Sequence, residues 1–270
     1  MSVTHSHQRH CENPASGAGE TIFSGVLYPL RLLAWLVGIV GFVVAGGLLT
    51  LWVRLLAVVA PGRSGELRVR RFIGFCFRMG LRWGRWTGVL RLDLSELENL
   101  RTKGGLLLAP NHPMLIDAAL VLSVLPETTC IMKAAIRDSP CLGGGARLAG
   151  YIRNDSASGM VKQAVADLQQ GRNILIFPEG TRTLPGRVLN DFKSGFALIA
   201  KKSGCPVQLL CIECSAPYLG KKWPLYRPPP FPLRVRVRVG PRVRVGPQEN
   251  THDAVRRLES LLARELNTAH

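Results

Sequence analysis

The most constraining feature of the sequence is a long uncharged segment in its first quarter. Residues 32–53 read LLAWLVGIVGFVVAGGLLTLWV, 22 residues without a charge, and Arg31 and Arg54 flank them. A helix of this length matches the roughly 30 Å hydrocarbon core of a bilayer. Buried core helices rarely hold more than about 14 uniformly apolar residues, and the run is too long for a signal peptide. The sequence therefore predicts a helix inserted in a membrane.

A basic amphipathic segment follows at residues 66–90, ELRVRRFIGFCFRMGLRWGRWTGVL. On a helix, arginines form one stripe and apolar side chains the other side, a pattern typical of a helix in a membrane interface. A merely solvated face and a nucleic-acid-binding helix are the alternatives, but the preceding apolar segment favours the bilayer. Because arginine is concentrated after that segment, we expect the rest of the chain on the cytoplasmic side. The arginine stripe is Arg68, Arg71, Arg78, Arg82 and Arg85, and the apolar side is Val69, Phe72, Ile73, Cys76, Met79 and Trp83.

Charge and cysteine content narrow the function classes. The 35 Lys and Arg against 18 Asp and Glu give a net charge of +17, which indicates nucleic acid, an anionic membrane or phosphorylated substrates as partners. Seven cysteines, an odd number, do not form a disulfide framework, so we expect a reducing compartment. Cys211 and Cys214 form C-x-x-C within an apolar stretch; two packed thiols are favoured over a metal or redox site. The histidines of HSHQRHC at 5–11 could bind a stray metal ion. The favoured interpretation is that residues 1–25 form a disordered tail.

After residue 92 the pattern changes to short apolar runs that alternate with helical segments. This alternation predicts an α/β fold with a mixed sheet covered by helices. We expect three parts: the tail at 1–25, a membrane anchor of two helices at 26–91, and a catalytic domain at 92–270. The alternating RVRVRVGPRVRV predicts late strands around Gly240 and Pro241, with Val inward and Arg solvated, rather than a nucleic-acid-binding element. The expected strands are 105–109, 128–133, 173–177, 206–214 and 233–239, and the expected helices are 114–125, 157–170, 191–203 and 252–267.

Two polar motifs stand at the ends of predicted strands. In LLLAPNHPMLIDAAL, His112 follows a strand end and Asp117 comes five residues later. In NILIFPEGTR, the strand ends in Pro178 and delivers Glu179, Gly180 and Arg182 into a turn. The carboxyl ends of neighbouring strands commonly hold functional groups in α/β sheets, so both motifs could face one cleft.

With these motifs the chain resembles the lysophosphatidic acid acyltransferase family of glycerolipid acyltransferases, whose first motif is N-H-x4-D and whose third is F-P-E-G-T-R. The resemblance covers about 92–248 and implies catalysis by His112 and Asp117. It also implies that a phosphate on the acceptor pairs with Arg182, while Glu179 and Gly180 help bind the head group. Bacterial members have a similar two-helix anchor. The further substrate-binding residues that the resemblance implies are Asn111, Lys133, Arg153, Thr181 and Lys193.

One motif departs from the family pattern. The family's second motif places an arginine six residues after a glycine, whereas Arg153 comes three residues after Gly150. Arg153 can take that role after a small shift. If it does not, a lyso-ornithine lipid or another hydroxylated lipid becomes the alternative acceptor to lysophosphatidic acid. A membrane-anchored basic nucleic-acid-binding protein is the alternative of another class.

The chemistry of the first motif agrees with acyl transfer. A hydroxyl attacks a thioester poorly unless a base removes its proton, and neutral imidazole suits that task near pH 7. Asp117 can fix the tautomer of His112, as carboxylates do in hydrolytic triads. No G-x-S-x-G elbow is present, so direct transfer from the thioester is the simpler mechanism. The sequence thus predicts an O-acyltransferase of the cytoplasmic (inner) membrane that uses no cofactor and no metal. Its expected partners are a lysophospholipid acceptor, acyl-CoA or acyl carrier protein as donor, and anionic membrane lipids, without nucleic acid.

Overall fold

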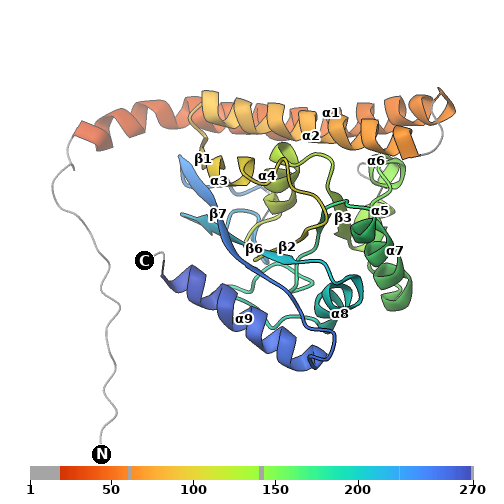
Figure 1. Ribbon diagram of the computed structural model, residues 1–270. Coiled ribbons are helices and arrows are strands. Elements are labelled where there is room, and N and C mark those ends of the chain that lie inside the picture. Colours follow the sequence, from red (N-terminus) through yellow and green to blue (C-terminus); the bar gives the residue numbers. More distant parts are fainter. Residues whose placement is uncertain (1–18, 60–62, 140–142, 225, 269–270) are drawn as a thin grey trace, which may run out of the picture.

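A mixed sheet lies between two layers of helices (Figure 1). The computed structural model describes residues 19–59, 63–139, 143–224 and 226–268, with side chains for all of these except 19–26, 49–59 and 63. Residues 1–18 of the tail predicted at 1–25 lie outside the described residues, and the first helix begins at Gly19 rather than after residue 25. The α/β class with a mixed sheet covered by helices is confirmed.

The sheet has seven strands in the order β1-β7-β6-β2-β5-β3-β4. Strands β2 to β6 run parallel to one another, β7 is antiparallel to β6, and β1 is parallel to β7. The carboxyl ends of five strands therefore meet at one edge, where α/β sheets place their sites. The strands are β1 (Leu90–Asp93), β2 (Leu107–Pro110), β3 (Thr129–Met132), β4 (Ile152–Arg153), β5 (Ile174–Leu175), β6 (Val207–Cys214) and β7 (Leu233–Val243).

The five predicted strands and four predicted helices of the catalytic domain are all present, with shifted ends. The elements that we did not predict are short: two strands, β1 and β4, and three helices of four to six residues. Fewer than two helical turns or two strand alternations leave no readable period. The helices of the domain are α3 (Ser95–Glu98), α4 (Asp117–Val124), α5 (Ala134–Arg137), α6 (Gly143–Leu148), α7 (Ala157–Gln169), α8 (Ser194–Ser203) and α9 (Thr251–Asn267).

The alternating valines and arginines form one strand rather than two. Strand β7 runs through Gly240 and Pro241 without a turn, and the pairing with β6 shifts register between Gln208 and Leu210. Val235 and Val237 are buried while Arg234 and Arg236 are exposed, which confirms the predicted alternation. A bulge lets the strand bend at Gly240 and continue.

Helices α1 (Gly19–Val59) and α2 (Arg63–Trp86) lie side by side along one face of the domain (Figure 1). Our assignment of the apolar side of α2 to the bilayer was wrong for Val69 and Ile73, which are buried in the core cluster shared with α4. Gly74 permits this close packing, because a Cβ there would lie 2.5 Å from Cβ of Pro126. Arg70, which follows Val69, is only 3% exposed, and its Nε donates to the carbonyl of Ala149 at 2.6 Å.

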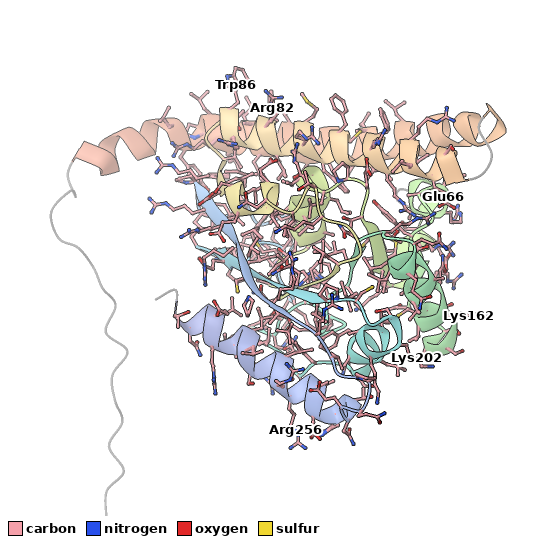
Figure 2. All side chains as sticks on the ribbon, in the orientation of Figure 1. Glu66, Arg82, Trp86, Lys162, Lys202 and Arg256 are labelled. Carbon is pink, nitrogen blue, oxygen red and sulfur yellow. The ribbon has the colours of Figure 1, made fainter. Side chains whose placement is uncertain are left out.

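The outward side of the α1–α2 layer carries the exposed apolar side chains. Helix α1 holds a 22-residue window, Leu27–Leu48, of mean hydropathy 2.0 that is long and apolar enough to cross a membrane. Figure 2 shows Trp86 and Arg82 of α2 pointing away from the domain. Large hydrophobic side chains exposed in such number commonly mark a contact with a membrane or with another protein. They include Leu30, Leu33, Val37, Val40, Val44 and Leu48 of α1 and Phe75, Met79 and Trp86 of α2.

Candidate active site

His112 and Asp117 meet at the carboxyl end of β2. His112 lies two residues beyond the strand, and Asp117 is the first residue of α4. The Nδ1 atom of His112 lies 2.9 Å from Oδ2 of Asp117, which also accepts a hydrogen bond from the backbone N–H of Met114 at 2.8 Å. Since a carboxylate only accepts, Nδ1 carries the proton and Nε2 keeps its lone pair for a substrate.

The side chain of Asp117 is fully buried. It has 0% exposure, and burial raises the pKa of its carboxyl, while the hydrogen bond and charge of His112 act the other way. The positive charge of Arg182 acts in the same direction as His112. A carboxylate held in this way keeps the imidazole in one tautomer and stabilises its protonated form during a reaction.

Phe177 fixes the plane of the histidine ring. It stands at the start of FPEGTR, and its ring centroid lies 3.9 Å from that of His112 at an interplanar angle of 22°. With one face covered by Phe177 and one nitrogen bonded to Asp117, the imidazole has little freedom to rotate. The two motifs therefore meet through side-chain packing, as their positions at strand ends predicted.

The buried side chain of Glu179 joins the FPEGTR turn to the turn of His112 and does not point into solvent. It is 1% exposed, and its carboxylate accepts from the backbone N–H of His112 at 2.8 Å, that of Asn190 at 2.9 Å, and the hydroxyl of Thr183. In return, the N–H of Thr183 donates to the carbonyl of His112 at 2.7 Å. Burial raises the pKa of the Glu179 carboxyl, and the hydrogen bonds from these donors act in the opposite direction. Both backbone groups of His112 are thus held by the turn that follows β5.

Asn111 extends the strand pairing beyond the end of β2. Its amide nitrogen donates to the carbonyl of Ile212 at 2.9 Å, and its amide oxygen accepts from the N–H of the same residue at 2.7 Å. The side chain is 4% exposed and imitates a peptide unit. This pairing sets the position of His112 relative to β6.

Arg182 contacts the loop between β6 and β7. Its Nη1 donates to the carbonyls of Leu219 at 2.6 Å and Gly220 at 3.4 Å. The same loop lies against the first motif, since a Cβ at Gly220 would come within 3.1 Å of the carbonyl of Pro113. The structure thus brings Arg182 into the neighbourhood of the His112–Asp117 pair, with part of its guanidinium hydrogen-bonded to the loop.

The other predicted residues lie at varied distances from this centre. Gly180 adopts φ +65°, and a Cβ there would lie 3.3 Å from Cγ of Lys193, so these two residues are neighbours. Lys133 is exposed at the end of β3, and Thr181 is half-buried in the turn. Arg153 ends β4, three strand spacings or about 14 Å from β2, and pairs with Asp138 and Asp155. Their substrate-binding roles stay predictions.

The cysteine pair of β6 consists of free thiols in the structure. Burial raises the pKa of Cys211 and of Cys214 to about 12. In the described part of the chain, no three His, Cys, Asp or Glu side chains gather where they could hold a metal ion. The histidines at 5–10 lie outside that part.

Comparison with known proteins agrees with this geometry. A family model described as Acyltransferase matches residues 91–213. The "Lyso-ornithine lipid O-acyltransferase" of Pseudomonas aeruginosa is 32% identical over 210 residues, which cover 71% of this chain and 75% of that protein. The chain belongs to the lysophosphatidic acid acyltransferase family of glycerolipid acyltransferases. It is accordingly an O-acyltransferase.

Further relatives of this family carry the name of another acceptor. The "1-acyl-sn-glycerol-3-phosphate acyltransferase" of Cocos nucifera is 29% identical over 163 residues, which cover 58% of this chain and 51% of that protein. The crystal structure of the "1-acyl-sn-glycerophosphate (LPA) acyltransferase, PlsC" of Thermotoga maritima superposes with a TM-score of 0.60 at 20% identity. It covers 92% of this chain and 97% of that one, which shows that the two share their fold across the helices and the sheet.

Sequence reasoning missed several residues that shape the site. Phe177 belongs to the FPEGTR motif, but nothing in the sequence indicates that its ring stacks on His112. Thr183 follows the motif directly, and its hydroxyl could have been considered as a partner of Glu179. Asn190 gave no signal, because it lies in a loop 11 residues beyond Glu179.

Proposed function

We propose that this protein is a membrane-bound acyltransferase that moves a fatty acyl group from an acyl thioester to the hydroxyl of a lysolipid. The observation that carries the proposal is the His112–Asp117 pair, held at a strand end with Nε2 as its remaining base. Phe177 and Glu179 fix the ring and the backbone of this histidine. Such an arrangement suits removal of a proton from a hydroxyl that is not itself acidic.

The reaction proceeds in one transfer without an acyl-enzyme. Nε2 of His112 takes the hydroxyl proton as the lysolipid oxygen attacks the thioester carbonyl carbon. The tetrahedral intermediate then expels the thiolate, which receives the proton from the imidazolium. The products are an ester and a free thiol, and Asp117 stabilises the charged imidazolium between the two steps.

The α1–α2 layer brings the enzyme to its acceptor at the cytoplasmic face of the inner membrane. The exposed apolar side chains of α1 and of the outer side of α2 enter the lipid, while arginines at their border meet anionic head groups. Figure 2 places Trp86 and Arg82 together on this outward side. A tryptophan beside an arginine is typical of the membrane interface.

The first candidate acceptor is 1-acyl-sn-glycerol-3-phosphate, which gives phosphatidic acid. Arg182 and Lys193 lie on the turn and loop that follow β5, and both can approach a phosphate in this edge of the sheet. Names of several relatives in bacteria and plants agree with this acceptor.

The second candidate acceptor is a lyso-ornithine lipid, and two observations favour it. The relative from Pseudomonas aeruginosa bears this name and aligns with 75% of its own length. Arg153, which would complete a phosphate site, is paired with Asp138 and Asp155 at the far edge of the sheet. An ornithine head group carries one carboxylate and one amine, so it needs fewer cations than a phosphate monoester of about two charges.

The test supplies the purified protein with labelled acyl-CoA or acyl carrier protein and a panel of lysolipids, and identifies the product by mass spectrometry. We expect one of the two candidates to be acylated, His112→Ala to abolish the transfer, and Asp117→Asn to retain a small remainder. General-base catalysis is worth about 10²–10⁴-fold in rate. Near-normal turnover by folded His112→Ala protein would disprove the mechanism.

A further inference from the structure

A surface cavity near the carboxyl end of β6 contains two arginines that the proposed mechanism does not use. Its volume is about 390 Å³, and it opens where β1, β7 and β6 lie side by side. Its polar lining consists of Arg91, Asp93, Glu213, Ser215, Arg234 and Arg236.

The acids of the cavity are already paired, but two of its arginines are not. Asp93 lies 3.3 Å from Arg236, and Glu213 lies 2.5 Å from Arg238. Across the described residues, the guanidinium groups of Arg91 and Arg234 have neither a hydrogen bond nor an ion pair.

These two arginines are direct neighbours on one face of the sheet. Arg91 and Arg234 are Cα partners in the parallel pairing of β1 with β7, so their side chains leave the same side. Like charges at such positions destabilise a sheet. A bound anion would offset this repulsion.

The cavity opens on the side of the sheet away from the α1–α2 layer. Arg238, on the same face of β7 as Arg234, donates to the carbonyl of Glu265 near the end of α9. Figure 1 shows α9 on the face opposite to α1 and α2. Because α9 ends at Asn267, it does not cover the face beyond Arg238. A ligand therefore reaches this cavity from water rather than from the lipid.

The cavity lies within reach of the catalytic histidine. Asn111, next to His112, pairs with Ile212, and Ser215 stands three residues further along the chain and bonds to Arg234 on β7. The path from Asn111 to Arg234 covers three residues along the strands and two strand spacings across the sheet, which corresponds to a separation on the order of 14 Å. A flexible arm of that length would connect an anion in the cavity to a reacting group at His112.

We propose that Arg91 and Arg234 bind the phosphate of the phosphopantetheine chain that carries the acyl thioester. This inference rests on the proposed thioester donor. Coenzyme A and acyl carrier proteins share this chain, in which an uncharged arm separates the phosphate from the sulfur. Guanidinium groups bind phosphate in a bidentate manner, and the hydroxyl of Ser215, which accepts from the N–H of Arg234 at 3.0 Å, keeps its own proton to donate.

The geometry assigns the two substrates to opposite sides. The lysolipid enters from the face covered by the α1–α2 layer, and the water-soluble donor approaches from the face of α9. Both reach His112 at the edge between these faces.

The test compares the unmodified enzyme with the double variant Arg91→Gln, Arg234→Gln. Three donors with the same acyl chain are used: acyl-CoA, acyl carrier protein, and S-acyl pantetheine, which lacks the phosphate. We expect KM for the phosphate-bearing donor to rise about tenfold or more, as two charge-assisted contacts imply, with kcat and acceptor KM nearly unchanged. With S-acyl pantetheine the two enzymes should behave alike. Arg256→Gln is the control, since Arg256 is an exposed arginine of α9 that points away from the domain in Figure 2.

A binding measurement separates this inference from the proposed function. Calorimetry with coenzyme A and with 4′-phosphopantetheine should detect binding to the unmodified enzyme and at least tenfold weaker binding to the double variant. If the enzyme binds them but acylates no lysolipid, the proposed function fails while the site stands. If KM rises in the double variant for only one of acyl-CoA and acyl carrier protein, that donor supplies the phosphopantetheine chain. An unchanged KM for both, or an equal loss with S-acyl pantetheine, overturns the assignment.

Discussion

Glu179 offers a direct test of whether the FPEGTR turn binds a head group or positions His112. Its carboxylate accepts hydrogen bonds from His112, Asn190 and Thr183 and is 1% exposed. In Glu179→Gln, one oxygen becomes an NH₂ group that cannot accept, so one buried backbone N–H loses its partner. The negative charge that strengthens the remaining bonds is lost as well.

The size of the effect follows from these contacts. A buried donor without a partner costs about 1–3 kcal/mol, and a charged acceptor adds roughly 1 kcal/mol to each remaining bond. We therefore expect the free energy of unfolding to fall by about 2–4 kcal/mol, which lowers Tm by roughly 5–15 °C for a chain of this size. If the N–H of His112 is released, the imidazole moves and kcat falls by as much as about 100-fold.

The assay combines denaturant unfolding in detergent with acyl-transfer kinetics at a temperature where both proteins are folded. Glu259→Gln is the matched control, because Glu259 accepts from the N–H of Phe192 at 2.9 Å at the start of α8. Glutamine keeps one oxygen for this single N–H, so the control loses only the charge, about 1 kcal/mol of stability, and should keep kcat. Unchanged stability and kcat in Glu179→Gln, together with a raised acceptor KM, would refute the positioning role and restore the head-group role that the family resemblance implies.

Three further predictions concern the packing of α2 on α4, the reactivity of the Cys211 thiol and the contact of α1 with the domain. Gly74→Val should destabilise the protein by about 1–3 kcal/mol in unfolding experiments, because the new side chain meets Pro126 at the contact of α2 with α4. Burial raises the pKa of Cys211 to about 12 and leaves its side chain 0% exposed, so at pH 8 its alkylation, followed by mass spectrometry, should be at least about 1,000-fold slower than that of a free thiol. Tyr218→Phe removes the acceptor of the buried indole N–H of Trp35 and should cost about 1–3 kcal/mol, whereas an unchanged Tm would show that this contact does not stabilise the protein.

Much of the fold was readable because the determining patterns are long or chemically distinct. The apolar run of α1 and the alternation of β7 each extend over more than ten residues, and the predicted strands end in the polar turns that now surround His112. Parallel strands with their carboxyl ends at one edge bring these turns together whatever the sequence between them. The meeting of the two motifs around His112 could therefore be predicted before the sheet order was known.

The parts that could not be predicted depend on contacts between distant segments. Helical periodicity separates the charged side of α2 from its apolar side, but it cannot say whether lipid or protein covers the apolar side. The answer depends on Pro126, which is far along the chain and touches Gly74. Likewise, a carboxylate in FPEGTR suits a substrate or a backbone donor equally well, and only the position of the His112 turn decides which one Glu179 meets. Strand β4, two residues long, carries no period at all.

The loop between β6 and β7 joins α1 to the candidate active site. The hydroxyl of Tyr218 accepts a hydrogen bond from Trp35 of α1 at 2.7 Å, and the carbonyl of the next residue, Leu219, accepts from Arg182 at 2.6 Å. The following residue, Gly220, packs on Pro113, so the loop cannot shift without disturbing the turn that holds His112. Because three consecutive residues contact α1, Arg182 and the turn of His112, α1 forms part of the support of the candidate active site. The placement of the apolar helix α1 and that of Arg182 therefore depend on the same few contacts.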